Sequence, residues 1–394
     1  MKVVISGDEY CYLKNGKHYL DDAGIILISR YLKAFDEVFF AIRTKTITER
    51  EELDKYHNLV DDNRVKIIEI PFFQGPQEYL LLYNKVRVTA LEALKGCDLA
   101  IFRLPSTTAF ALWHTAIKLK IPYVTEIVFD CYDGYETTNN FLYKILWKIL
   151  HQWQVKACNN AIGVACVTEH YLQQRYFPLN KDAVISNYST IELNPSFYYK
   201  SRVYPQKKCF TIVHVANQVA YASRKGHNEL IKVVYEVNKL GYNVEVKFIG
   251  KDYFGGIERL RAFSRKLKIE DKIFFTGFLS KSAMREVMIN ADIAILPTRA
   301  EGLPRVVIEA MALGLPCITS PVSGNPELVS KDLLIDYLDV RGMSLKVIDL
   351  IEHKQYYEKT SEDNFLRSRQ YSSEVLNPRR TAFYNEVKSL IHNL

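Results

Sequence analysis

The chain has 394 residues, of which 48% are hydrophobic and 25% are charged, which is typical of a globular protein of about two domains. The formal net charge of +7 suits an anionic small molecule or an acidic membrane surface, and no run of like charges indicates a nucleic-acid partner. Seven cysteines, an odd number without a C-x-x-C pair, argue against a disulfide framework and against a zinc site. There is no signal-peptide core and no apolar run of the roughly 18 residues that span a membrane, so we expect a cytoplasmic location.

Predicted strands and helices alternate along the first half of the chain. Short apolar runs predict the strands, and apolar residues that recur every three or four positions predict the helices. The predicted strands are 2–6, 37–42, 65–70, 99–102, 123–128 and 161–167, and the predicted helices are 23–35, 80–94 and 108–118, with another beginning at 169–174.

The alternation stops and then resumes in the second half. Residues 191–208 carry no clear period, and we expect a linker there. The next predicted strands are 210–215, 244–249, 273–276, 293–296 and 316–319, and the predicted helices are 227–240, 257–267, 282–289, 304–313 and 375–394.

This order predicts an α/β fold of two Rossmann-like, doubly wound domains that face a cleft. We expect an N-terminal domain at 1–190, the linker at 191–208 and a C-terminal domain at 209–374. The last helix, 375–394, could cross back to the N-terminal domain. Ligands should bind at the carboxyl ends of the strands.

The loop after the strand 293–296 is predicted to bind an anion. Because Pro304 suits the first position of the following helix, the amides around Gly302, Leu303 and Arg305 lack helical partners. Together with the helix dipole, these amides suit a diphosphate.

Two carboxylates flank this helix start. Glu301 lies before the helix and Glu309 lies in its second turn, so they could hold different parts of one long ligand. A solvated helix residue is the alternative interpretation of Glu309.

The frame E-G-x-x-x-x-x-x-E-A-M-A-x-G-x-P, from Glu301 to Pro316, resembles the signature of glycosyltransferase family 4, the glycosyl transferases group 1. The similarity covers roughly residues 210–330, and it implies the GT-B fold without a required metal. It also implies that Glu301 contacts the donor sugar near the reacting carbon and that Glu309 binds the ribose hydroxyls. The amides after Gly302 would hold the sugar and the phosphate.

Arg224 and Lys225 precede the helix 227–240. Two cations at a helix start oppose the helix dipole, which favours a bound anion between them, although a solvated surface pair is the alternative. They resemble the family's R-K-G element, whose cations would stabilise the departing nucleotide. Many members have Gly-Arg at the preceding strand end, where this chain has Ala216 and Asn217, and Arg224 is the candidate substitute.

The first domain matches the family less closely. Family members often carry a histidine after the strand 123–128, where this chain has Glu126 and Asp130. Both are candidates for acceptor contact or acid–base chemistry, and a carboxylate that caps the next helix is the alternative. We favour Gly24 over Gly16 as the glycine that approaches the phosphates.

The segment 141–153 is amphipathic. Lys144, Lys148 and His151 lie near one another, and apolar residues line another side. Basic residues beside Trp and Tyr suit a helix that lies on an anionic membrane, whereas a buried domain helix has nearly the same pattern.

The residues and the resemblance together predict a retaining, metal-independent glycosyltransferase of the hexosyltransferase type. It would move a sugar from a nucleotide diphosphate-sugar to a glycan or lipid-linked acceptor in surface-polysaccharide biosynthesis, and it could lie peripherally on the inner face of the cell membrane. We expect no cofactor, and a UDP-sugar is favoured over a GDP-sugar as donor. The predicted catalytic residues are Glu301, Lys225 and Arg224, and the predicted nucleotide-binding residues are Glu309, Gly302, Leu303, Arg305 and Gly24.

Two alternatives remain open, namely a nucleotide-sugar 2-epimerase on the same fold and a non-catalytic transferase-like subunit. A dinucleotide oxidoreductase is disfavoured because no G-x-G-x-x-G follows the first strand.

Overall fold

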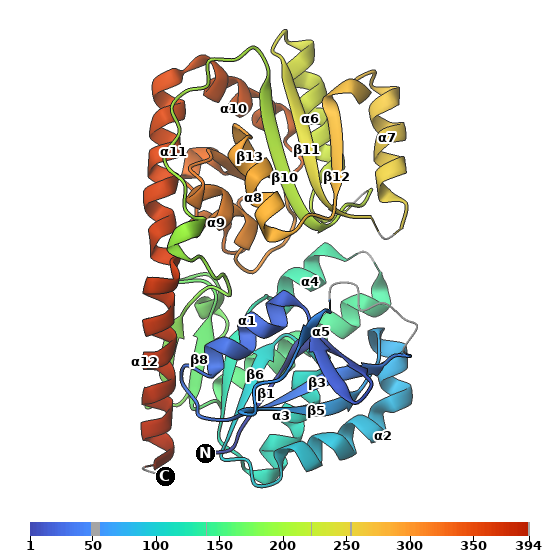
Figure 1. The fold of residues 1–394 in the computed structure, drawn as a ribbon, viewed down its shortest axis with the longest axis vertical. Coiled ribbons are helices and arrows are strands. Elements are labelled where there is room, and N and C mark those ends of the chain that lie inside the picture. Colours follow the sequence, from blue (N-terminus) through green and yellow to red (C-terminus); the bar gives the residue numbers. More distant parts are fainter. Residues whose placement is uncertain (49–55, 139, 222, 253, 393–394) are drawn as a thin grey trace. The chain divides into compact units, whose positions relative to one another are not determined.

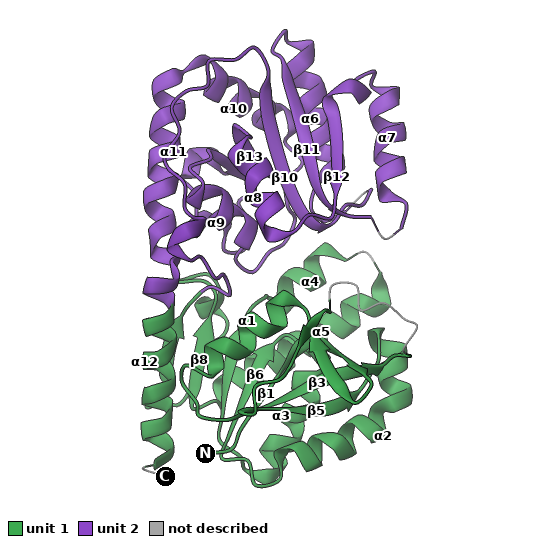
Figure 2. Cartoon of the chain, in the orientation of Figure 1, with its two compact units in different colours: residues 1–188, 377–394 green, residues 189–376 purple. Residues whose placement is uncertain are grey.

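Alternating strands and helices build two units, which Figure 2 distinguishes by colour. The computed structural model describes residues 1–48, 56–138, 140–221, 223–252 and 254–392. The first unit comprises Met1–Tyr188 and Asn377–Leu394, and the second comprises Ser189–Leu376.

The first unit contains a mainly parallel sheet. Its parallel strands follow the order β5-β3-β1-β6-β7-β8-β9, and an antiparallel hairpin, β1–β2, carries the short β4 at its edge. The β1–β3 register shifts between Ser6 and Tyr10. The strand bounds are β1 (Val3–Lys14), β2 (Lys17–Leu20), β3 (Val38–Thr46), β4 (Asn58–Leu59), β5 (Val65–Pro71), β6 (Leu99–Leu104), β7 (Tyr123–Ile127), β8 (Gly163–Cys166) and β9 (Val184–Asn187).

Several helices of the first unit start at side-chain caps. The side chains of Asp21, Ser106 and Asn140 accept hydrogen bonds from amides of the first turns of α1, α3 and α5, and these bonds satisfy donors that a helix leaves unpaired. The helices are α1 (Asp22–Tyr31), α2 (Gly75–Leu94), α3 (Thr107–Leu119), α4 (Cys131–Thr137), α5 (Phe141–Asn159) and, from Asn377 onward, α12 (Ser373–His392) (Figure 1).

The second unit contains a smaller sheet that is parallel throughout, in the order β12-β11-β10-β13-β14. The strands are β10 (Phe210–Gln218), β11 (Val244–Lys251), β12 (Ile273–Gly277), β13 (Ile293–Leu296) and β14 (Cys317–Thr319). The helices are α6 (His227–Lys239), α7 (Gly256–Lys266), α8 (Lys281–Ile289), α9 (Arg305–Ala312), α10 (Val340–Glu352) and α11 (Lys354–Ser368).

The segment 191–208, which we expected to form a linker, packs on the second unit. The Arg202 guanidinium donates hydrogen bonds to the carbonyls of Leu313 (2.8 Å) and Ile289 (2.6 Å), and the Tyr199 amide donates to Ala312 (3.1 Å). These bonds tie an irregular segment to the ends of two helices.

The C-terminal helix α12 joins the first unit from Asn377 onward, and its last two residues lie outside the described part. Phe383 and Val387 are buried, and both lie 3.1 Å from where a Cβ at Gly163 would stand. The absence of a side chain at Gly163 therefore allows α12 to pack closely on β8.

One predicted helix is largely absent. Residues 169–174 form only a short 3-10 turn, Leu172–Gln174, because the Thr168 hydroxyl binds the Leu172 amide (2.9 Å) and Gln173 folds back on Thr168. Among the helices that the structure describes, none has both the length and the apolar composition that a membrane crossing requires.

Candidate functional site

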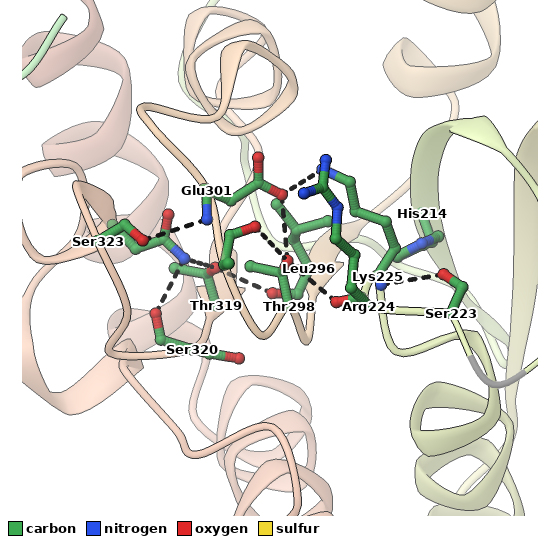
Figure 3. Close-up of polar contacts among 12 residues, drawn as sticks. His214, Ser223, Arg224, Lys225, Leu296, Thr298, Glu301, Thr319, Ser320 and Ser323 are labelled. Carbon is green, nitrogen blue, oxygen red and sulfur yellow. Dashed lines mark hydrogen bonds and ion pairs between the residues drawn. The ribbon is translucent and has the colours of Figure 1, made fainter. Parts of the chain in front are cut away.

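An ion pair between Lys225 and Glu301 lies at the centre of the candidate site in the second unit (Figure 3). The side chains are 22% and 12% exposed, respectively, and the ammonium donates to Oε1 of the carboxylate. The Thr298 hydroxyl lies 3.1 Å from the same oxygen. Glu301 is therefore held in one orientation by a cation and a hydroxyl.

The two loops that carry this pair are joined through their backbones. The Arg299 amide donates to the Arg224 carbonyl (2.9 Å). Gly226 has φ +67°, and a Cβ there would lie 2.0 Å from the Pro297 carbonyl oxygen. Only glycine fits this approach, so the loop before α6 is locked against the loop after β13.

The helix start after Glu301 presents unpaired amides. The amides of Gly302, Leu303 and Arg305 have no hydrogen-bond acceptor among the described residues. Pro304 is the N-cap rather than the first helical residue, because its ψ of 108° is extended, so α9 starts one residue later than predicted. Donors without partners at a helix start form an anion site.

The loop that contains Ser323 and Gly324 holds the backbone of Glu301 and Gly302 by hydrogen bonds. The Ser323 hydroxyl accepts from the Glu301 amide (3.2 Å), and the Gly324 amide donates to the Gly302 carbonyl (3.0 Å). Ser323 has a left-handed φ of +51°, and Asn325 holds the loop by donating to Thr319 Oγ1 (2.8 Å).

Glu309 lies in α9, half-buried, and its carboxylate makes no hydrogen bond or ion pair within the described part of the chain. Burial raises its pKa, and the charges of Arg305 and Lys281 oppose that shift. A desolvated carboxylate without a protein partner can accept hydrogen bonds from the hydroxyls of a ligand. Arg305 itself is exposed.

Glu126 does not fit the acceptor role that we considered. It is 8% exposed and accepts hydrogen bonds from the hydroxyls of Tyr31 (2.9 Å), Tyr188 (2.9 Å) and Tyr384, and it also pairs with Arg103 (3.3 Å). A carboxylate in the buried strand β7 requires such donors to offset its desolvation. Its oxygens are therefore occupied within the first unit.

Asp130 follows the alternative interpretation, in which it caps a helix. It is fully buried, accepts from the Tyr132 amide (2.8 Å) at the start of α4, and binds Arg175 (2.5 Å) and the Tyr176 hydroxyl. These partners leave it as a structural carboxylate.

Gly24 is also engaged within the protein. Its amide donates to Asp21 Oδ1 (2.9 Å), which caps α1. A carboxylate at this helix start disfavours a phosphate, so the geometry argues against our choice of Gly24.

The sequence reasoning missed a carboxylate in the middle of β1, just beyond the residues that pair with β6. The strand order reverses at β1, which lies between β3 and β6, and such switch points bind ligands in α/β sheets. Here Asp8 is 67% exposed and is held by Arg43, whose side chain is only 5% exposed and stacks on Tyr10 (4.2 Å). Beside it, Glu9 pairs with Arg103. The acidic pair directly after the predicted strand was the available signal.

The N-terminal half of α5 exposes apolar side chains. Phe141 and Leu142 are each 73% exposed and Ile145 is 44% exposed, whereas the buried residues of α5 lie at its other end. Lys148 is exposed near them. This part of the helix therefore has an apolar surface without a covering element among the described residues of the first unit.

The described residues offer no cluster of metal ligands. Across the ranges that the structure describes, no three His, Cys, Asp or Glu side chains form a group that could hold a metal ion.

Comparison with known proteins places these features in a family context. Residues 203–366 match the family model for glycosyl transferases group 1. Protein CapJ of Staphylococcus aureus is 26% identical over 375 residues, which cover 93% of this chain and 90% of CapJ. The putative colanic acid biosynthesis glycosyltransferase WcaL of Escherichia coli is 27% identical over 153 residues, 36% of this chain and 37% of WcaL.

A solved structure extends the similarity to the whole fold. The complex of Anabaena HepE with UDP-glucose matches all of both chains with a TM-score of 0.65 at 16% identity. The predicted fold class, GT-B with two Rossmann-like domains, is thereby confirmed.

Proposed function

We propose that the chain is a retaining glycosyltransferase that uses a nucleotide diphosphate-sugar, because residues 203–366 match the family model for glycosyl transferases group 1. The observation that carries this proposal is the Lys225–Glu301 pair beside the unpaired amides at the start of α9. These groups provide a cation, a carboxylate and anion-binding donors at one place. Of the sequence-predicted residues, we retain Glu301, Lys225 and Arg224 as catalytic and Glu309, Gly302, Leu303 and Arg305 as nucleotide-binding.

The proposed chemistry uses opposite charges on the two sides of the breaking bond. As the bond between the anomeric carbon and the diphosphate oxygen lengthens, negative charge grows on the diphosphate and positive charge grows on the sugar. Lys225, Arg224 and the helix-start amides stabilise the diphosphate, whereas Glu301 stabilises the oxocarbenium-like sugar. The acceptor hydroxyl then bonds to the anomeric carbon, and its proton passes to the departing diphosphate oxygen. Because protein cations balance the leaving group, we infer that no divalent metal is needed.

The donor is inferred to be a UDP-sugar, and Glu309 would bind its ribose. The half-buried carboxylate lies one helical turn beyond the amides, so it can reach a different part of the nucleotide from Glu301. HepE was solved with UDP-glucose, which supports this choice of nucleotide.

We infer that the acceptor is a glycan or a lipid-linked glycan of a surface polysaccharide. WcaL, a relative over 36% of this chain, is named for colanic acid biosynthesis, which supports this class. The exposed apolar residues of α5, beside Lys148, suit peripheral contact with an anionic membrane that carries such an acceptor.

Thermal-shift screening against UDP, GDP, ADP and their sugars tests the donor, because a ligand that binds the folded state raises its stability. We expect UDP and a UDP-sugar to raise the melting temperature. If no nucleotide does so, the proposed donor class is wrong.

Product analysis then separates a transferase from the alternatives. With the stabilising donor and a membrane extract, a transferase yields a glycosylated product that retains the donor's anomeric configuration. Free 2-epimerised sugar would instead indicate an epimerase, and donor binding without any product would indicate a non-catalytic subunit.

A further inference from the structure

Two buried histidines lie behind the Lys225 loop. His214, in β10, is 1% exposed, and His227, the first residue of α6, is fully buried. Their ring centroids are 4.6 Å apart at 70°, and both rings pack against Phe248 at 5.4 Å. Nothing in the proposed chemistry uses either imidazole.

A short hydrogen-bond relay joins His227 to Lys225. The Lys225 amide donates to Ser223 Oγ (3.0 Å), and this oxygen lies 3.1 Å from Nδ1 of His227. Because the Ser223 oxygen accepts from Lys225, its proton is available for Nδ1. With Nδ1 of His227 unprotonated, the Ser223 hydroxyl donates to it and the relay is complete.

His214 connects to the other half of the ion pair. Its Nδ1 lies 2.9 Å from the carbonyl oxygen of Ile295, which can only accept, so this nitrogen carries a proton. Ile295 belongs to β13, and the chain runs from there directly into the loop that carries Glu301. The edge-to-face contact of the two rings thus joins the strand before Glu301 to the loop of Lys225.

Both imidazoles are neutral around pH 7. Burial, together with the charge of Lys225, lowers the pKa of His214 to about 4 and that of His227 to about 2. Neither Nε2 has a hydrogen-bond partner in the described structure. Each neutral ring keeps one unprotonated nitrogen, and the relay uses Nδ1 of His227 as that acceptor.

We propose that the His214–His227 pair, acting through Ser223, positions Lys225 against Glu301. The two histidines and Ser223 are positioning residues, since none of them contacts the reacting atoms in the proposed chemistry. The consequence for the leaving diphosphate rests on the proposed function, whereas the positioning of Lys225 can be measured in the empty protein.

The reactivity of the Lys225 amine measures its position directly. In the wild type the ion pair shields Nζ, so acetic anhydride should acetylate Lys225 slowly, as followed by peptide mass spectrometry. Glu301→Gln removes the charge that holds Lys225, so its acetylation rate is the reference for a protein without the ion pair. We expect Ser223→Ala and His227→Phe to raise the rate about fivefold, the scale of losing one internal hydrogen bond.

Two variants serve as controls. His227→Asn keeps a side-chain oxygen near the position of Nδ1 and should restore the slow wild-type rate. Ser344→Ala removes another buried hydroxyl of the second unit, one that donates to the Val340 carbonyl (2.8 Å). This variant should leave the acetylation of Lys225 as slow as in the wild type. If His227→Phe does not fold, the acetylation rate of Lys225 in Ser223→Ala still tests the proposal. Wild-type labelling in Ser223→Ala would overturn the proposal, as would fast labelling in Ser344→Ala.

Calorimetric titration with UDP links the relay to the proposed function. Ser223→Ala should weaken UDP binding about fivefold while leaving uridine binding unchanged. If the wild type does not bind UDP, the proposed function fails, and the labelling rates still decide whether the relay positions Lys225.

Discussion

At the scale of single residues, substitution of Lys225 is the most direct test of the proposed chemistry. Lys225→Ala should lower turnover by about 100-fold or more, as for the loss of one preorganised charge stabiliser. UDP should bind more weakly, because the lost ammonium would contact the diphosphate, whereas uridine should bind as before. Kinetics and calorimetry check this, with the exposed Lys232→Ala as control. Equal weakening of UDP and uridine would contradict a phosphate contact.

Substitution of Glu309 should affect the stability of the empty protein and its affinity for UDP differently. Burial raises its folded-state pKa above the unfolded value, so the folded protein holds this proton to higher pH and ionised Glu309 costs stability above that pKa. Glu309→Gln should therefore leave the melting temperature of the empty protein at neutral pH unchanged or slightly higher, while UDP binds about tenfold more weakly.

Two comparisons check this interpretation of Glu309. The exposed Glu362→Gln should change neither the melting temperature nor UDP binding. Wild-type UDP affinity should fall as the pH drops through the raised pKa. A Glu309→Gln protein that binds UDP normally would remove Glu309 from the site.

At the scale of secondary-structure elements, Glu126 links four parts of the first unit. Its partners lie in α1, β6 and α12 and after β9. Glu126→Gln should destabilise the first unit by about 3 kcal/mol, because Arg103 loses a buried countercharge and the tyrosine hydroxyls lose a charged acceptor. Urea unfolding measures this. UDP affinity of the folded protein should not change, and its loss would return Glu126 to the site.

Helix α5 supports an element-scale prediction about membranes. Wild-type protein should pellet with anionic vesicles at low salt and release at high salt, because surface charges are screened. Lys144→Glu with Lys148→Glu should abolish binding, whereas Lys118→Glu with Lys120→Glu, at the end of α3, should not. Binding that ignores both salt and charge reversal would exclude an electrostatic membrane contact.

The predicted elements were most accurate where the apolar pattern was clear. The strand 293–296 matches β13, and the helix 108–118 differs from α3 by one residue at each end. The hairpin strand β2 and the helices α10 and α11 were not predicted. Residues 354–368 of α11 have a weak apolar period, and their burial on the second unit depends on contacts from distant segments, such as Tyr357 to the Asp292 carbonyl (2.9 Å).

At the scale of the whole molecule, the proposed mechanism balances the negative charge of the donor diphosphate with cations of the protein. Since Lys225 and Arg224 are proposed to neutralise the diphosphate, transfer should continue in excess EDTA at the rate seen without chelator. Measuring transfer before and after chelation, with and without added magnesium, checks this. Complete loss that magnesium restores would show that a metal, rather than these cations, balances the diphosphate.

Local sequence was sufficient to predict the two-domain α/β fold and the residues around Glu301, because alternating apolar runs and helix-start chemistry depend on neighbours in the chain. Tertiary structure alone decided which of these residues are available to a ligand. Glu126 and Asp130 look like Glu309 in sequence, yet their oxygens are occupied by Tyr, Arg and amide donors from distant segments, whereas Glu309 has no hydrogen-bonding partner in the described chain. The Lys225–Glu301 pair joins residues 76 positions apart, a separation that no local pattern can bridge.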